Sequence, residues 1–127
     1  MPKCIVADDS SIIRSVINII LTNRGFDVVE TDNGDETVYL YNQMKDDLAL
    51  IILDYEISGT NGLDILYKIR SEEEKTDRRV SIIMSSFVTS EKRIRDALDG
   101  GADDYLMRPF DGDILNSKLE HLGVMDE

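Results

Sequence analysis

The sequence contains one cysteine, one histidine and two prolines. A single cysteine, Cys4, excludes a disulfide within the chain and any zinc site built from several cysteines. A single histidine, with no CxxC or HExxH motif, leaves little room for histidine-based catalysis or transition-metal binding. The prolines, Pro2 and Pro109, stand far apart, and no linker, low-complexity tract or internal repeat is visible.

Long hydrophobic runs are also missing. The longest, Leu48–Leu53, is far shorter than the roughly 20 apolar residues of a membrane-spanning helix. Met1-Pro2-Lys3 leads directly into a short apolar segment, without the hydrophobic region of a signal peptide. We therefore expect a cytoplasmic protein with no membrane insertion.

Basic residues are few: the 127 residues include 14 Lys and Arg against 26 Asp and Glu, a net charge of −12. An acidic protein repels phosphate backbones, so we expect no direct nucleic-acid binding. Hydrophobic residues still make up 42% of the chain, enough for a core, and the length predicts a single domain over residues 1–127. The abundant functional group is carboxylate, which suits Mg²⁺.

Short apolar runs alternate with segments of helical periodicity. The runs are nearly continuous and rich in β-branched residues, which is typical of parallel strands buried on both faces. The predicted strands are Cys4–Ala7, Phe26–Glu30, Leu48–Leu53, Val80–Met84 and Asp104–Met107. Between and after them, apolar residues recur at helical spacing, as in Ile13, Val16, Ile17, Ile20 and Leu21.

Local signals mark the ends of several predicted helices. Gly25 suits the position after the first helix, Asn33–Glu36 resembles a capping box, and Asp111 is a candidate N-cap for the last helix. Five strand–helix units predict an α/β fold: a doubly wound five-stranded parallel sheet with helices on both faces. The strand order 2-1-3-4-5 covers both faces and leaves a crevice at the carboxyl ends of strands one and three.

Polar residues follow the predicted strands at those carboxyl ends. Asp8 and Asp9 follow the first strand, Asp54 the third, Ser85 the fourth and Arg108 the fifth. Three converging carboxylates repel one another unless a cation is present, and Mg²⁺ (or Mn²⁺) needs few protein ligands. An aspartate can act as a nucleophile toward a phosphoryl group, and a hydroxyl and a cation can contact its oxygens.

With these residues in place, the chain resembles the receiver domains of two-component response regulators, close to the single-domain chemotaxis type with the flavodoxin-like order 2-1-3-4-5. The resemblance runs from about Lys3 to Leu122. It depends on an ordered set of short motifs, which are Asp8-Asp9, Leu53-Asp54, Asn61-Gly62, Ser85-Ser86, Gly101-Ala102 and Arg108-Pro109-Phe110.

The resemblance implies a role for each matching position. Asp54 matches the phosphoacceptor, and the implied metal ligands are Asp8, Asp9, Asp54 and the backbone carbonyl of Glu56. Ser85 matches the residue whose hydroxyl reaches the phosphoryl group, and Tyr105 matches the switch aromatic, which turns inward when that hydroxyl moves.

Two positions depart from the family pattern. Arg108 stands where the family nearly always has lysine, and a planar guanidinium differs from a compact ammonium group in reach and geometry. Phe87, two residues after Ser85, places a bulky ring near the acceptor. Pro109 keeps the proline that often follows a cis peptide bond in this family.

The resemblance implies a signalling module that takes a phosphoryl group from a sensor histidine kinase or a histidine phosphotransfer protein. The module catalyses only its own Mg²⁺-dependent phosphorylation and dephosphorylation, and it then binds a protein target through the fourth helix, fifth strand and fifth helix.

Other readings of these residues remain open. A pseudo-receiver would bind its partner regardless of phosphate, and Arg108 favours this. A haloacid-dehalogenase-type phosphatase would use Asp54-Tyr55-Glu56 as a loose DxD motif. Tyr105 also fits simple half-buried packing, and Arg108 an ordinary pairing with a carboxylate.

Overall fold

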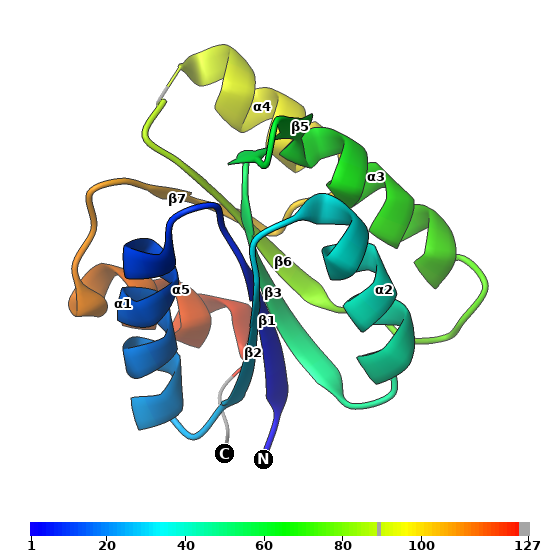
Figure 1. Cartoon of the computed structure of the whole chain (residues 1–127), viewed down its shortest axis with the longest axis horizontal. Helices are drawn as coiled ribbons and strands as arrows, with labels where there is room; N and C mark the ends of the chain where they lie inside the picture. Colours follow the sequence, from blue (N-terminus) through cyan, green and yellow to red (C-terminus); the bar gives the residue numbers. More distant parts are fainter. Residues whose placement is uncertain (89, 125–127) are drawn as a thin grey trace.

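The structure, a computed structural model, describes residues 1–88 and 90–124. Strands and helices alternate along the chain (Figure 1). They are β1 (Lys3–Ala7), α1 (Ser11–Asn23), β2 (Asp27–Thr31), α2 (Gly34–Met44), β3 (Leu48–Asp54), β4 (Glu56–Ile57), β5 (Thr60–Asn61), α3 (Gly62–Glu73), β6 (Ser81–Ser86), α4 (Glu91–Asp99), β7 (Asp104–Met107) and α5 (Gly112–Leu122).

The five longer strands form one sheet in the order β2-β1-β3-β6-β7, and every pair in it is parallel. This confirms the predicted doubly wound order. Helices α1 and α5 cover one face of the sheet, while α2, α3 and α4 cover the other (Figure 1). Parallel pairing brings the carboxyl ends of β1, β3 and β6 to one edge.

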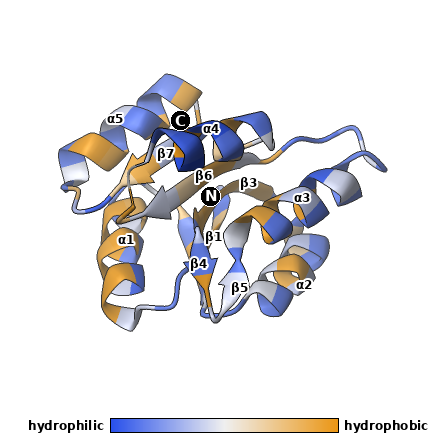
Figure 2. Cartoon of the chain, turned by 90° about the horizontal axis from the view of Figure 1, so that it is seen from above, coloured by the Kyte–Doolittle hydropathy of each residue, from blue (hydrophilic) through white to orange (hydrophobic). Residues whose placement is uncertain are grey.

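The sheet divides the hydrophobic core into two layers. Ile17 and Leu21 of α1 and Leu115 of α5 pack with Val6 on one face. Ile65 and its neighbours on α3 pack on the other face with Tyr41 of α2 and Ala97 of α4. Figure 2 shows that the polarity of the helices differs: α4 is mostly hydrophilic, whereas α1 is hydrophobic along much of its length.

Side chains at the helix starts satisfy backbone N–H groups that have no partner within the helix. The Ser10 hydroxyl accepts from the Ile13 N–H at 3.2 Å, and the Asp111 carboxylate accepts from the Ile114 N–H at 2.9 Å. The Asn33 side chain accepts from the Glu36 N–H at 2.7 Å. The predicted caps at Asn33 and Asp111 are therefore confirmed, and each such cap contributes about 1 kcal/mol.

Two details of the fold differ from the prediction. Strand β6 continues through Ser86, because Ser85 pairs with Asp54 of β3 and Ser86 with Met107 of β7. An unpredicted hairpin, β4–β5, follows Asp54, and Ser58 in its turn has a positive φ of 45°. Two-residue hairpin turns favour positive φ because their twist matches that of the strands.

A third difference concerns the outer surface of α1. Val16, predicted as part of the buried stripe, is 42% exposed, because only Ile17 and Leu21 on this helix are fully covered by α5 and the sheet. Among the described residues, no helix combines the length and hydrophobicity that crossing a membrane would require.

Candidate functional site

Strand pairing gathers the predicted site residues at the carboxyl edge of the sheet. Asp54 lies beside Ser85 in the β3–β6 register, and Asp8 directly follows β1, whose last residue pairs with Leu53. Asp8, Asp54, Ser85 and Arg108 are all buried, although each carries a polar or charged side chain. Buried polar groups need partners, so their hydrogen bonds define the site.

Backbone N–H groups hold the Asp54 carboxylate. Its Oδ1 accepts from the Glu56 N–H at 3.1 Å, and its Oδ2 accepts from the Asp9 N–H at 3.4 Å. The pKa of Asp54 is raised to about 6, chiefly by burial and also by the negative charge of Asp8, while the two N–H groups and Arg108 act in the opposite direction. The groups around Asp54 thus do not fully balance the negative charge of its carboxylate. Such a site suits a nucleophile that works beside a cation.

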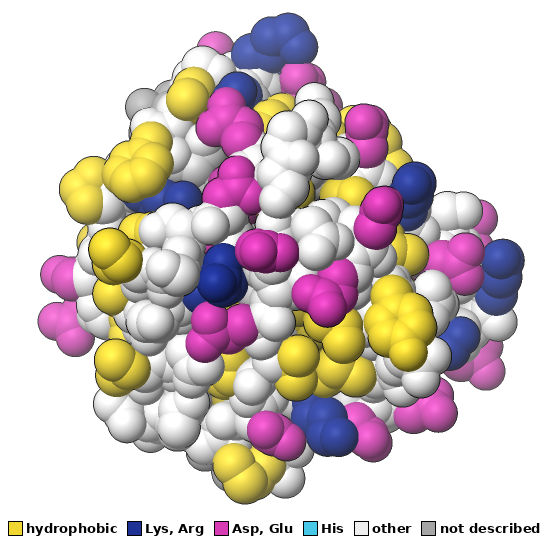
Figure 3. All heavy atoms as spheres, in the orientation of Figure 1, with side chains coloured by type: hydrophobic (Ala, Val, Ile, Leu, Met, Phe, Trp, Pro, Cys, Tyr) yellow, Lys and Arg dark blue, Asp and Glu magenta, His cyan; other side chains and the backbone are white. Residues whose placement is uncertain are grey.

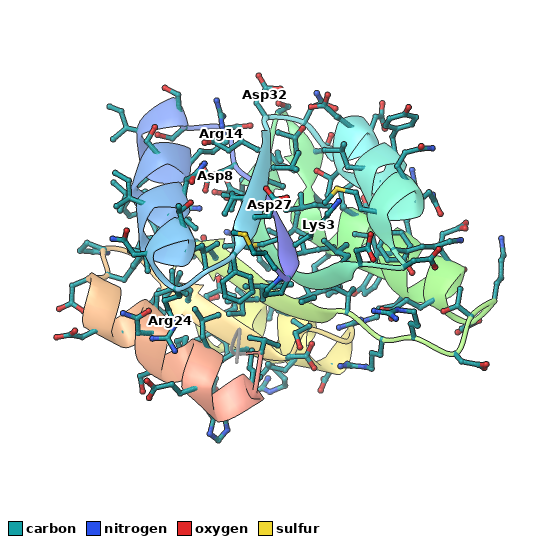
Figure 4. All side chains as sticks on the ribbon, turned by 90° about the horizontal axis from the view of Figure 1, so that it is seen from below. Lys3, Asp8, Arg14, Arg24, Asp27 and Asp32 are labelled. Carbon is teal, nitrogen blue, oxygen red and sulfur yellow. The ribbon has the colours of Figure 1, made fainter. Side chains whose placement is uncertain are left out.

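Arg108 contacts three of the predicted site residues. Its Nε donates to the Ser85 hydroxyl at 2.8 Å, and its Nη2 donates to Oδ2 of Asp8. The same Nη2 lies 3.8 Å from Oδ1 of Asp54, so Asp8 is the primary ionic partner. Figure 4 shows Asp8 near the amino end of α1.

The other side of the Arg108 guanidinium lies near an exposed aromatic ring. Its central carbon is 5.5 Å from the centroid of Phe87, within the range of a cation–π interaction. The Arg108–Pro109 peptide bond is cis, as the resemblance implies.

Asp9 is exposed and faces the hairpin that follows Asp54. Its Oδ1 accepts from both the backbone N–H and the hydroxyl of Ser58, the latter at 3.1 Å. The Ser58 hydroxyl shares its one proton between Asp9 and the backbone carbonyl of Asp32. These bonds hold the turn between β4 and β5 against the end of β1.

The donor atoms at this edge suit a hard divalent cation. Asp9 and Asp54 offer carboxylate oxygens, and Mg²⁺ needs only one or two carboxylates besides water and other oxygen atoms. Within residues 1–88 and 90–124, however, no three His, Cys, Asp or Glu side chains are grouped as a ready metal centre. Asp8 is engaged by Arg108, so the donor chemistry fits Mg²⁺ while one carboxylate is already paired.

Arg93 of α4 is a site neighbour that sequence reasoning missed. Its Nη2 lies 2.7 Å from Oε2 of Glu56, and its Nη1 donates to the Ser86 hydroxyl at 3.3 Å. The guanidinium also lies 4.4 Å above the Tyr55 ring. An arginine in a charged helix carries no sequence signal for such contacts. The Glu56 carboxylate, which the phosphatase interpretation would use as its second acidic group, is therefore paired with an arginine of α4.

Tyr105 of β7 is buried, and its hydroxyl donates to the Val88 carbonyl at 3.0 Å. Its ring centroid is 6.4 Å from that of Tyr55. Burial raises the pKa of the Tyr105 phenol, and the hydrogen bond with Ser86 opposes this effect. The ring therefore occupies an inward position, in contact with the loop that leads from β6 to α4.

Figure 3 shows acidic side chains spread over one face of the molecule with basic side chains between them, in keeping with the net charge of −12. A pocket with a volume of about 410 Å³ lies beside the site between the β4–β5 hairpin and α4, lined by Tyr55, Glu56, Gly59, Thr60, Asn61 and Arg93.

Comparison with known proteins identifies relatives over nearly the whole chain. A family model described as "Response regulator receiver domain" matches residues 4–120. The chemotaxis protein CheY homolog of Campylobacter jejuni is 34% identical over 119 residues, which cover 93% of this chain and 89% of that protein.

Solved structures with the same fold include Vibrio cholerae chemotaxis protein CheY4, with a TM-score of 0.84 at 23% identity, covering 95% of this chain and 98% of that chain. The receiver domain of a Pseudomonas aeruginosa sensor histidine kinase has a magnesium ion coordinated in its active site cleft. It matches with a TM-score of 0.82 at 23% identity, covering 94% of this chain and 95% of that chain.

Proposed function

Because the chain belongs to the response regulator receiver domain family, we propose that it is the phosphoacceptor module of a two-component system. Asp54 receives a phosphoryl group from a histidine of a sensor kinase or a phosphotransfer protein. The main support is the convergence of a buried nucleophilic carboxylate with the Ser85 hydroxyl and the Arg108 guanidinium at one strand edge.

Phosphoryl transfer makes modest demands on the protein. An Asp54 oxygen attacks the phosphorus, the bond between phosphorus and the donor imidazole breaks, and the imidazole nitrogen leaves with its electron pair. Ser85 and Arg108 donate to the phosphoryl oxygens. When bound, Mg²⁺ neutralises charge on the carboxylates and the phosphoryl group. The groups that would hold it are the carboxylates of Asp8, Asp9 and Asp54 and the backbone carbonyl of Glu56.

Dephosphorylation reverses the modification with water. A water oxygen attacks phosphorus, the bond to the Asp54 oxygen breaks, and inorganic phosphate leaves. In this proposal the protein works in the cytoplasm and catalyses only its own phosphorylation and dephosphorylation.

The output is the binding of a protein target by the surface of α4, β7 and α5. Two contacts support this assignment, since both connect the site to that surface. Arg93 of α4 binds Glu56, two residues after the acceptor, and Tyr105 of β7 binds the Val88 carbonyl in the loop after Ser85. A phosphoryl group adds about −1.5 to −2 charges, enough to reorganise such contacts.

The alternative is a phosphorylation-independent interaction module. One observation favours it: Arg108 already contacts both Asp8 and Ser85, so the groups that would receive metal and phosphate are paired without them.

Incubation with Mg²⁺ and acetyl phosphate, followed by intact mass measurement, separates the two functions. We expect one added phosphoryl group in the wild-type protein, none in Asp54→Asn, and none in EDTA. An unmodified wild-type mass under all conditions would favour the alternative.

A further inference from the structure

The contacts of Arg108 coincide with the groups that the proposed function needs. Its guanidinium spans the Ser85 hydroxyl and the Asp8 carboxylate, with Asp54 at 3.8 Å. We call the paired contacts of Arg108 with Asp8 and Ser85 the arginine clamp. Only 8% of Arg108 and 1% of Asp8 are exposed, so solvent screens this ion pair very little.

We propose that Arg108 is an internal cation that competes with the divalent metal for Asp8, so that the clamp sets metal affinity and opens when metal binds. This inference rests on the proposed function, because it concerns the metal that supports phosphorylation. The released guanidinium is then available to the Asp54 phosphoryl group.

Charge balance supports the competition. Asp8, Asp9 and Asp54 carry three negative charges when ionised, and Arg108 carries one positive charge. The net charge of these four side chains is therefore −2. A divalent ion balances that charge, but a full metal site would draw on the Asp8 carboxylate that Arg108 holds. Separating a buried ion pair is costly unless another charge replaces the lost partner, so metal binding and clamp opening are linked.

The clamp depends on the shape of arginine. Its Nε and Nη2 bind two different groups at once, whereas the ammonium of lysine is a single point charge. Asp8 itself has little freedom to move, because its Oδ1 accepts from the Ser10 N–H at 2.9 Å and its backbone carbonyl accepts from Arg14 at 2.6 Å. Opening the clamp therefore requires movement of the Arg108 side chain.

The test is a Mg²⁺ titration followed by backbone amide NMR shifts. Arg108→Lys removes the fork and keeps the charge, so its Mg²⁺ affinity should exceed that of the wild type by roughly tenfold, the effect of losing one charge-assisted hydrogen bond. Arg79→Lys is the matched control, because it makes the same substitution at an arginine that pairs with a carboxylate, Asp103, at the opposite edge of the sheet. Its affinity should stay close to that of the wild type.

A second measurement needs no variant and reports the clamp directly. The Arg108 Nε–H group, bound to Ser85, should give a resolved side-chain signal that exchanges slowly with water, and saturating Mg²⁺ should shift it. Equal Mg²⁺ affinities in wild type and Arg108→Lys would contradict the proposed competition, and so would an Arg108 Nε–H signal that does not shift on addition of Mg²⁺. Either result would leave the proposed function intact. No Mg²⁺ binding by either protein would instead contradict the metal role in the proposed function.

Discussion

Arg93 of α4 binds the carboxylate of Glu56, two residues after Asp54, at 2.7 Å. The same guanidinium reaches the Ser86 hydroxyl and lies over the Tyr55 ring. One side chain of the proposed output helix therefore contacts both β4, which follows the acceptor, and the end of β6, which pairs with the acceptor strand. Such a contact can transmit a change at the site because it belongs to two elements at once.

We predict that Arg93→Gln weakens the response of α4 without unfolding the protein. The pair is partly exposed, with 27% of the Arg93 side chain and 61% of the Glu56 side chain accessible, so its direct contribution to stability is at most about 1 kcal/mol. The NMR shifts that Mg²⁺ and beryllofluoride induce in residues 91–99 should shrink to less than about half, because the link to the site is lost.

Arg95→Gln is the control for this prediction, since Arg95 lies on the same helix, pairs with Glu91 of that helix and has 58% of its side chain exposed. It should leave the shifts of residues 91–99 as large as in the wild type. Equal shifts in the Arg93→Gln protein would show that α4 receives no signal through Glu56.

A second prediction concerns Gly62, the first residue of α3. A Cβ atom at this position would lie 2.4 Å from the backbone oxygen of Asp54 and 2.9 Å from backbone atoms of Tyr55. Backbone cannot move aside cheaply, so Gly62→Ala should destabilise the protein by about 1–3 kcal/mol and displace the acceptor loop. Thermal unfolding and acetyl phosphate labelling should both be impaired.

Gly112→Ala provides a matched control, because Gly112 is likewise the first residue of its helix, α5. There a Cβ would meet only side-chain atoms of Ile20, the nearer at 3.9 Å, which is ordinary contact. Its unfolding temperature and labelling should match those of the wild type. If Gly62→Ala behaves like Gly112→Ala, α3 approaches Asp54 less closely than the structure has it.

These features differ in how far sequence predicts them. The strand order and the caps at Asn33 and Asp111 followed from local patterns, because burial on both faces and capping chemistry act over a few residues. The gathering of Asp54 and Ser85 followed from topology, since parallel strands end at the same edge.

Other features depend on geometry that no local pattern encodes. Arg93 and Glu56 are 37 residues apart, and nothing in either segment marks the pairing. The sequence shows the positive charge of Arg108. Whether its guanidinium pairs with Asp8 or with Asp54 depends on the orientation of the side chain in the folded protein. Ser85 and Ser86 were predicted beyond the strand because the apolar run of this segment ends at Met84. In the structure, pairing with β3 and β7 keeps Ser85 in β6, and pairing with β7 keeps Ser86 there.

A third prediction concerns the opposite edge of the sheet. The partly buried side chain of Arg70 binds the carboxylates of Glu73 at 2.7 Å and Asp103 at 3.0 Å, and the carbonyls of Val80 and Gly101 at 2.7 and 3.0 Å. Arg70→Ala would remove the ionic partner of the buried Glu73 carboxylate and one of the two arginines that bind Asp103, so it should lower the free energy of unfolding by about 3 kcal/mol. Denaturant unfolding measures this loss.

The protein that stays folded should still be labelled on Asp54, because Arg70 lies away from the acceptor. Arg79→Ala is the comparison: Arg79 also binds Asp103, at 2.6 Å, but 57% of its side chain is exposed. Its cost should stay below about 1 kcal/mol. If Arg70→Ala lowers the free energy of unfolding as little as Arg79→Ala does, water replaces the contacts that Arg70 makes.

The last prediction concerns pH and follows from the Asp54 carboxyl. Burial raises its pKa to about 6 from an ordinary value of 3.8, so the folded state binds a proton more tightly than the unfolded state. The resulting stability is fully present below about pH 4 and is lost as pH rises through about 6. At pH 7.5 without a divalent cation, the ionised carboxylate therefore costs on the order of 2–3 kcal/mol.

Asp54→Asn removes this cost, because the amide stays neutral at every pH. In EDTA, it should raise the free energy of unfolding by about 1–3 kcal/mol at pH 7.5 and change it little at pH 4. Asp46→Asn, at an exposed position in the loop before β3, should show no such pH-dependent gain. Mg²⁺ should stabilise the wild type at pH 7.5 more than it stabilises Asp54→Asn, since it offsets the same charge. A gain from Asp54→Asn that is equal at pH 4 and pH 7.5 would show that packing, rather than the buried charge, accounts for it.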